Sequence, residues 1–454
     1  MPVRNIVISK SILLLYLGVF SPYIAAHEPE KVANDLIFRA SRIPDRIVLN
    51  FTATPKTSIG VNWRTDAGDY PAFIEYATAS DGPQDLKGLQ RITAETQSFE
   101  SKAGKVKFHS AVLAGIKPGT AYVYRVGDGV NWSELFQFRT ESESPEAFQF
   151  LYFGDAQNDI RMHWSRVIRQ AQRDASKSAF MLHAGDLVNA HVNDHEWGEW
   201  FGAGGFLNAM IPAFVTPGNH EYSRGQDGLP VLTPHWRAQF NLPLNGIKGL
   251  EESVYYVDYS NTRLISLNSN EQQEIQTKWL DELLSQKDRP LWTIITFHHP
   301  IYSVSKGRDS TKLRDMWQPI FDKHQVDLVL CGHDHTYARS GPRIHDNKPA
   351  GEQVRRNTSG TVYVVSVSGP KMYDINDQEW MLRRAEFTQL YQIISVEGDK
   401  LEFQSRTAAG NLYDKFQMRK IAGKAAEFID LQPLTPERRK SESTTKSDPS
   451  LKIK

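Results

Sequence analysis

The chain has 454 residues, 40% of them hydrophobic and 23% charged, with 53 Lys+Arg balanced by 53 Asp+Glu. This length allows two or three domains, and the zero net charge excludes nucleic-acid binding driven by an overall positive charge. A mean hydropathy of −0.47 excludes a polytopic membrane protein, and the single cysteine, Cys331, excludes internal disulfides and a cysteine-rich zinc module.

The first 26 residues have the order of a secretory signal. Arg4 and Lys10 precede an apolar run over residues 11–20, which is too short to span a bilayer, and Ala25 and Ala26 follow as small residues. We expect cleavage after Ala26, export to the periplasm or the medium, and no stable membrane span afterwards. The alternative is an N-terminal anchor that stays uncleaved.

Residues 43–142 carry a pattern of short strands. Runs at 47–51, 59–64 and 73–77 are separated by turn residues, and Tyr122 follows a Pro-Gly corner at 118–119. With Trp63 as a core residue, this pattern resembles a fibronectin type III sandwich, in which a tyrosine hydroxyl ties the corner.

Residues 146–415 alternate apolar strands with helical patterns, which predicts a layered α/β domain of the αββα type. A helical face is expected around Met162–Ala171. The expected strands are 148–153, 180–182, 213–215, 264–267, 291–297, 328–331, 361–365, 390–396 and 401–404. Residues 421–454 are polar and are expected to form a disordered tail.

Five polar clusters follow the ends of apolar strands in this second domain. They are Gly154-Asp155-Ala156-Gln157, Gly185-Asp186-Leu187-Val188-Asn189, Gly218-Asn219-His220-Glu221, His298-His299-Pro300 and Gly332-His333-Asp334-His335. Each cluster alone is a weak signal, but strand ends of a layered sheet meet along one edge, so the five should converge.

The converging side chains suit two metal ions about 3.5–4 Å apart. Asp186 could bridge the ions, because a carboxylate has two oxygens with spare lone pairs. Asp155 and His335 would hold one ion. Asn219, His298 and His333 would hold the other.

Order and spacing of the clusters resemble the metallophosphoesterase superfamily, and the preceding sandwich resembles its purple acid phosphatase branch. The resemblance implies the ligand roles just given and makes His220 the histidine that contacts substrate and assists the leaving group. His299 is then a neighbour and not a ligand. It further implies phosphomonoester hydrolysis by a metal-bound hydroxide.

Two residues depart from the purple acid phosphatase pattern. Asn189 stands where those enzymes have a metal-ligating tyrosine, and Gln157 where they have glycine and other members have histidine. Either residue could touch a metal or support a ligand. Without a tyrosinate, we expect two divalent ions, with iron, manganese and zinc all open.

Substrate contacts are less clear from the sequence. Lys306 and Arg308 could clamp a phosphate, and His191 could line the cleft, although all three could equally be solvated loop residues. A phosphodiester or nucleotide is the second candidate substrate, and a non-catalytic exported binding protein is the alternative of another class. The oligomeric state has no sequence signal.

Overall fold

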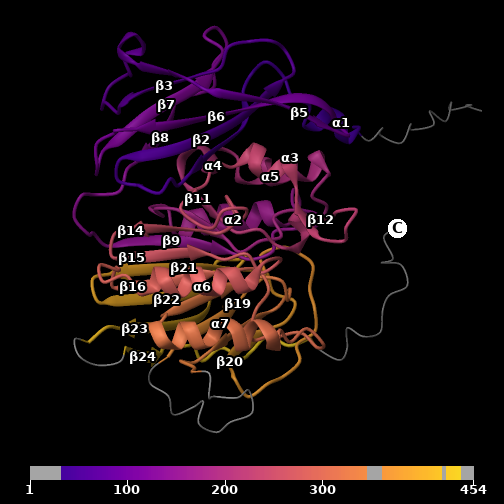
Figure 1. Cartoon of the computed structure of the whole chain (residues 1–454), viewed down its shortest axis with the longest axis vertical. Helices are drawn as coiled ribbons and strands as arrows, with labels where there is room; N and C mark the ends of the chain where they lie inside the picture. The colour runs from indigo at the N-terminus through magenta and orange to yellow at the C-terminus, as the bar shows by residue number, and fades with distance from the viewer. Residues whose placement is uncertain (1–31, 345–359, 422–425, 441–454) are drawn as a thin grey trace, which may run out of the picture.

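The computed structural model describes residues 32–344, 360–421 and 426–440. A β-sandwich at one end is followed by a layered α/β domain (Figure 1). The predicted fold class is therefore confirmed. The predicted signal segment, residues 1–26, lies outside the described residues. No helix among the described residues is long and apolar enough to cross a bilayer.

Two antiparallel sheets form the sandwich, with strand orders β4-β3-β7-β8 and β1-β2-β6-β5. Trp63 is buried in its core. The hydroxyl of Tyr122 accepts a hydrogen bond of 2.8 Å from the Lys117 backbone N–H, which confirms the predicted corner. The elements are α1 Asn34–Ile37, β1 Asp45–Asn50, β2 Ser58–Asp66, β3 Phe73–Thr78, the 3-10 helix η1 Leu86–Gly88, β4 Gln90–Thr93, β5 Glu95–Ser101, β6 Gly104–Ala114, β7 Ala121–Gly127 and β8 Phe136–Arg139.

The α/β domain contains two sheets that pack face to face. The first has the order β24-β23-β22-β21-β9-β10-β11 and the second β14-β15-β16-β17-β19-β18-β20. The Tyr152 hydroxyl of β9 donates to the Cys331 carbonyl of β17 and links the two sheets. The bounds are β9 Phe148–Phe153, β10 Met181–His183, β11 Ala213–Val215, β14 Tyr255–Tyr259, β15 Thr262–Ser266, β16 Trp292–Thr296, β17 Leu328–Cys331, β18 Tyr337–Ser340, β19 Val362–Val365, β20 Met381–Ala385, β21 Leu390–Glu397, β22 Lys400–Thr407, β23 Leu412–Arg419 and β24 Glu427–Asp430.

Helices cover the outer faces of both sheets. Leu264 and Ile294 belong to the core between the sheets, whereas their neighbours Ile265 and Ile295 pack with α6 and α7, as the two-residue period of a strand requires. On the other side, Trp164 of α2 packs on β9 and β10. The remaining elements are α2 Trp164–Asp174, α3 Asp194–Gly204, α4 Phe206–Met210, η2 Asn219–Glu221, the hairpin β12 Tyr222–Arg224 and β13 Pro230–Leu232, α5 Pro234–Gln239, α6 Gln273–Leu284 and α7 Thr311–His324. Met162, expected on the helical face, precedes α2 and is exposed.

One sheet runs through both domains. β1 of the sandwich pairs in parallel with β11 of the α/β domain at Asn50 and Ala213, so the first sheet has eleven strands. Beside this joint, the buried Asp194 at the start of α3 accepts hydrogen bonds from Arg46 of β1 and Arg64 of β2. The domains are therefore joined by backbone pairing and by a buried ion cluster.

The expectation of a disordered tail from residue 421 is wrong for residues 426–440. β24 pairs antiparallel with β23, and Arg339 reaches from β18 to Asp430 with a 3.0 Å hydrogen bond. Further along, Glu437 accepts a hydrogen bond from Arg384 of β20. The polar composition of this segment reflects ion pairs with the sheet, which cannot be read from the segment alone.

Candidate metal centre

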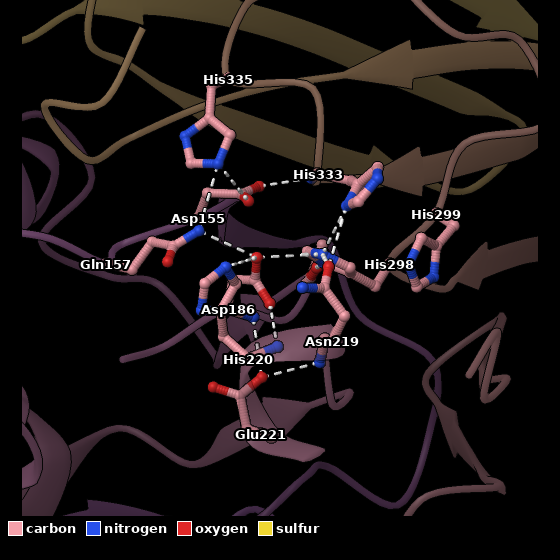
Figure 2. Close-up of polar contacts among 12 residues, drawn as sticks. Asp155, Gln157, Asp186, Asn219, His220, Glu221, His298, His299, His333 and His335 are labelled. Carbon is pink, nitrogen blue, oxygen red and sulfur yellow. Dashed lines mark hydrogen bonds and ion pairs between the residues drawn. The ribbon is translucent and has the colours of Figure 1, made fainter. Parts of the chain in front are cut away.

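The loops that follow parallel strands bring the predicted ligands together (Figure 2). Asp155 follows β9, Asp186 follows β10 and Asn219 follows β11 in the first sheet. His298 follows β16, and His333 and His335 follow β17, in the second. Because the two sheets face each other, both sets of loops open at the same end of the domain.

Four of these residues have left-handed backbone conformations. The φ angles are 38° at Asp155, 51° at Asp186, 74° at His333 and 46° at His335. Non-glycine residues adopt such angles uncommonly, although Asn, Asp and His do so more often than others, and strained residues cluster at functional sites. Four of the six predicted ligands share this conformation, which Asn158 and Asp159, shortly after Asp155, also adopt.

The first group consists of Asp155, Asp186 and His335, whose ligand atoms all lie within 4.8 Å of one another. Gln157 is completely buried between two of them. Its Nε2 lies 2.9 Å from Asp186 Oδ2 and 3.1 Å from His335 Nε2. The side-chain oxygen of Gln157, Oε1, is buried without a hydrogen-bond partner among the described residues. The Gln157 side chain therefore belongs to this group, where it contacts two predicted ligands.

The second group forms around Asn219. The side-chain oxygen of Asn219 lies 3.1 Å from His298 Nε2 and 3.0 Å from His333 Nδ1, and these two nitrogens are 3.2 Å apart. Asp186 Oδ2 lies 3.2 Å from His298 Nε2, so Asp186 contacts both groups, as a bridging carboxylate would. His299 also offers a nitrogen within 4.8 Å of His298 and His333.

The charge state of these groups fits a bound cation. His298 Nδ1 lies 2.9 Å from the Ala184 carbonyl, which fixes the proton there, so Nε2 of a neutral ring presents its lone pair to Asp186 and Asn219. Burial opposes a charge on His298, but Asp186 and Asp155 outweigh it and raise its pKa to about 9. Burial also raises the pKa of Asp155, whose Oδ1 has no hydrogen-bond partner among the described residues. A cation at this position would replace the His298 proton as the positive charge that faces the buried Asp186 and Asp155 carboxylates.

Glu221 holds two site loops in place and was not predicted from the sequence. This buried carboxylate accepts hydrogen bonds from the backbone N–H groups of Gly218 (2.7 Å), Asp186 (2.9 Å) and Leu187 (2.8 Å). The adjacent His220 donates its backbone N–H to Asp186 Oδ1 over 2.9 Å, and its Nδ1 lies 2.5 Å from the Asn189 carbonyl. Its Nε2 lies 4.0 Å from Asp186 Oδ2, so the ring points into the site.

The other predicted contacts differ in their distance from the site. Arg308 donates to the His333 carbonyl over 3.0 Å and remains partly exposed beside the site. Burial and the charge of the nearby His220 lower the pKa of His191. Asn189 contacts His220 through its backbone, and its side chain makes no hydrogen bond among the described residues. Lys306 is exposed.

Lys371 is a second residue that the sequence did not single out. Its carbonyl lies 3.1 Å from His335 Nδ1 and orients that ring. Burial and the Lys371 charge lower the pKa of His335 to about 3. Lys371 lies outside the five clusters, and Glu221 lies in one of them but was not predicted as a ligand. Both residues act on the site through hydrogen bonds that involve backbone groups, and these groups come together only in the folded chain.

Comparisons with known proteins agree with this geometry. Residues 113–337 match the model of the calcineurin-like phosphoesterases, and residues 44–140 match the purple acid phosphatase N-terminal domain. An uncharacterized protein of Mycobacterium tuberculosis is 26% identical, over 65% of this chain and 61% of its own length. Purple acid phosphatase 21 of Arabidopsis thaliana is 27% identical, over 64% of this chain and 66% of its own length. The chain thus spans less than two thirds of these relatives.

A solved structure shows the same fold. The purple acid phosphatase PPD1 from yellow lupin seeds superposes with a TM-score of 0.71, at 18% identity, over 84% of this chain and 75% of that one. At this identity the likeness concerns the fold, and it includes both the sandwich and the α/β domain.

Proposed function

Because the chain belongs to the calcineurin-like phosphoesterases and carries a purple acid phosphatase N-terminal domain, we propose that it is an exported, metal-dependent phosphomonoesterase. Export is proposed from the sequence of residues 1–26 alone. The proposed ligands are the six residues predicted from the sequence, with Asp186 shared between two divalent ions.

One observation carries the proposal: six side chains distant in the sequence bring their oxygen and nitrogen atoms together in two adjoining groups that share Asp186. Asp186 lies within reach of both groups, and Gln157 and His298 contact it from opposite sides. Such a buried set of oxygen and nitrogen donors matches the ligand chemistry of iron, manganese and zinc.

Two bound divalent ions would activate a water molecule and stabilise the charge of a phosphoryl group in the transition state. The residues of the chain would orient the reaction. His220 points into the site while the Asn189 carbonyl holds its Nδ1, so the other ring nitrogen, Nε2, is placed to give a proton to the leaving oxygen. Partly exposed Arg308 donates to the carbonyl of the proposed ligand His333 and would be available to a phosphate oxygen bound beside it.

The test is hydrolysis of p-nitrophenyl phosphate and bis-p-nitrophenyl phosphate by full-length protein supplied with manganese, zinc or iron. We expect hydrolysis of the monoester, and Asp186→Ala should abolish it while the circular dichroism spectrum stays unchanged. Faster hydrolysis of the diester would identify a phosphodiesterase. If neither ester is hydrolysed with any metal, the chain is a binding protein and the proposal is wrong.

A further inference from the structure

A cleft of about 1300 Å³ opens from the candidate metal centre. Asn219 and His299, which lie together on the side of the centre away from Gln157 (Figure 2), form its inner end. Three segments form its walls: the β12–β13 hairpin, the loop leading into α6 and the loop leading into α7. The leaving group of a phosphate ester hydrolysed at the metal centre would therefore lie in this preformed cleft.

Eight uncharged amide and hydroxyl side chains are the most numerous kind of residue lining this cleft. They are Asn219, Ser223, Ser269, Asn270, Gln272, Gln273, Ser310 and Thr311. Apolar surface is supplied by Tyr222, Pro230, Ile275, Leu313 and Met316. The charged lining residues, Arg224, Glu274, Asp309 and Lys312, balance one another in sign.

Part of this hydrogen-bonding capacity is unused. Gln273 donates from Nε2 to the Ser269 carbonyl over 2.9 Å, and its side-chain oxygen accepts no hydrogen bond among the described residues. Ser310 precedes α7 but does not cap it, and its hydroxyl is unbonded in the described part of the chain. Amides and hydroxyls both donate and accept, so they match the hydroxyl groups of a ligand. A second phosphate would call for donors alone, and an alkyl chain would leave these groups unpaired.

We propose that this cleft binds the leaving group of the substrate and that the leaving group is a polyhydroxylated alcohol of sugar size. Its hydroxyls would bond to the amide and hydroxyl side chains, and its C–H faces would lie on the apolar ones. This inference rests on the proposed phosphomonoesterase function and adds the substrate class to it.

The experiment compares a hexose 6-phosphate with n-hexyl phosphate as substrates of the metal-loaded full-length protein. We expect kcat/KM to be at least about tenfold higher for the sugar ester, since several hydrogen bonds distinguish the two. Gln273→Leu should lower this ratio about five- to tenfold. Gln137→Leu, an exposed glutamine on β8, is the matched control and should leave it unchanged.

Ser310→Trp provides an independent test, because it fills the cleft without removing a helix cap. The KM for the hexose phosphate should rise more than tenfold relative to the inhibition constant of inorganic phosphate. Equal kcat/KM values for the two esters, or an unchanged KM in Ser310→Trp, would overturn the inference while the phosphatase function stands. Absence of hydrolysis of every ester would overturn both.

Discussion

Glu221 shows how a residue outside the proposed ligand set can decide whether a metal is held. Its two oxygens accept backbone hydrogen bonds from both loops that present Asp186 and Asn219. Supporting groups of this kind orient ligands, and their loss typically lowers metal affinity by a factor of about 10–100.

We therefore expect Glu221→Gln to lower metal affinity to that extent, because the amide turns an N–H donor toward backbone donors. The bound metal is measured by mass spectrometry after dialysis against a chelator of known affinity. Glu397→Gln, at the exposed end of β21, is the control. Full metal retention in Glu221→Gln would show that the loops hold their shape without this carboxylate.

Gln157 is the residue of the first group that is interpreted from the sequence as a departure from the purple acid phosphatase pattern. An amide is a weaker ligand than an imidazole, and here it lies 3.1 Å from His335 Nε2. Replacing it with histidine should tighten binding of the first ion, by on the order of tenfold, whereas Gln157→Leu should weaken it. Chelator titration followed by metal analysis distinguishes these outcomes. Identical affinities in all three proteins would place Gln157 outside the ligand set.

At the level of elements, the start of α3 is tied to the sandwich by charge. Asp194 is the common carboxylate partner of Arg46 and Arg64, both of which are almost completely buried. Without Asp194, Arg46 would lose its carboxylate partner while Arg64 would keep Asp45, and removing one member of a buried ion pair costs about 3–5 kcal/mol. We expect Asp194→Ala to lower the free energy of unfolding by this amount, seen as a lower Tm. Asp281→Ala, which removes pairs with exposed Lys323 and with His324 at the end of α7, should change the Tm less.

The strands and their polar ends could be predicted because they depend on local signals. The run Phe148–Phe153 followed by Asp155 is readable from the sequence, and the α/β strand ends do converge as expected. The pairing of β24 with β23 could not be predicted, since residues 426–440 are polar and acquire their structure from distant partners such as Arg339. The same holds for Glu221, whose partners are backbone groups that converge only on folding.

At the level of the whole molecule, Glu141 links the end of the sandwich to the turn between β14 and β15. Its Oε1 accepts the Ser260 N–H over 2.6 Å, and burial raises its pKa to about 7 from an ordinary value of 4.5. Between pH 4.5 and pH 7, the folded chain therefore keeps a proton on Glu141 that the unfolded chain has lost. The contribution of Glu141 to the free energy of unfolding therefore falls as the pH rises from 4.5 to 7.

Glu141→Gln should remove this part of the pH dependence while keeping the acceptor for Ser260. We expect the Tm of the variant to rise relative to the Tm of the unmodified protein as the pH increases from 4.5 to 8. Thermal scans at several pH values measure it. A constant difference across that range would mean that Glu141 titrates normally in the folded protein.

The pairing of β1 with β11 has a consequence for how the molecule can be taken apart. Producing the two domains as separate chains, divided between residues 142 and 146, would remove β1 from β11 and expose a strand edge on each fragment. We therefore expect the two domains to unfold in a single transition. A fusion of either domain to a foreign protein would have to supply a new neighbour for the exposed strand edge.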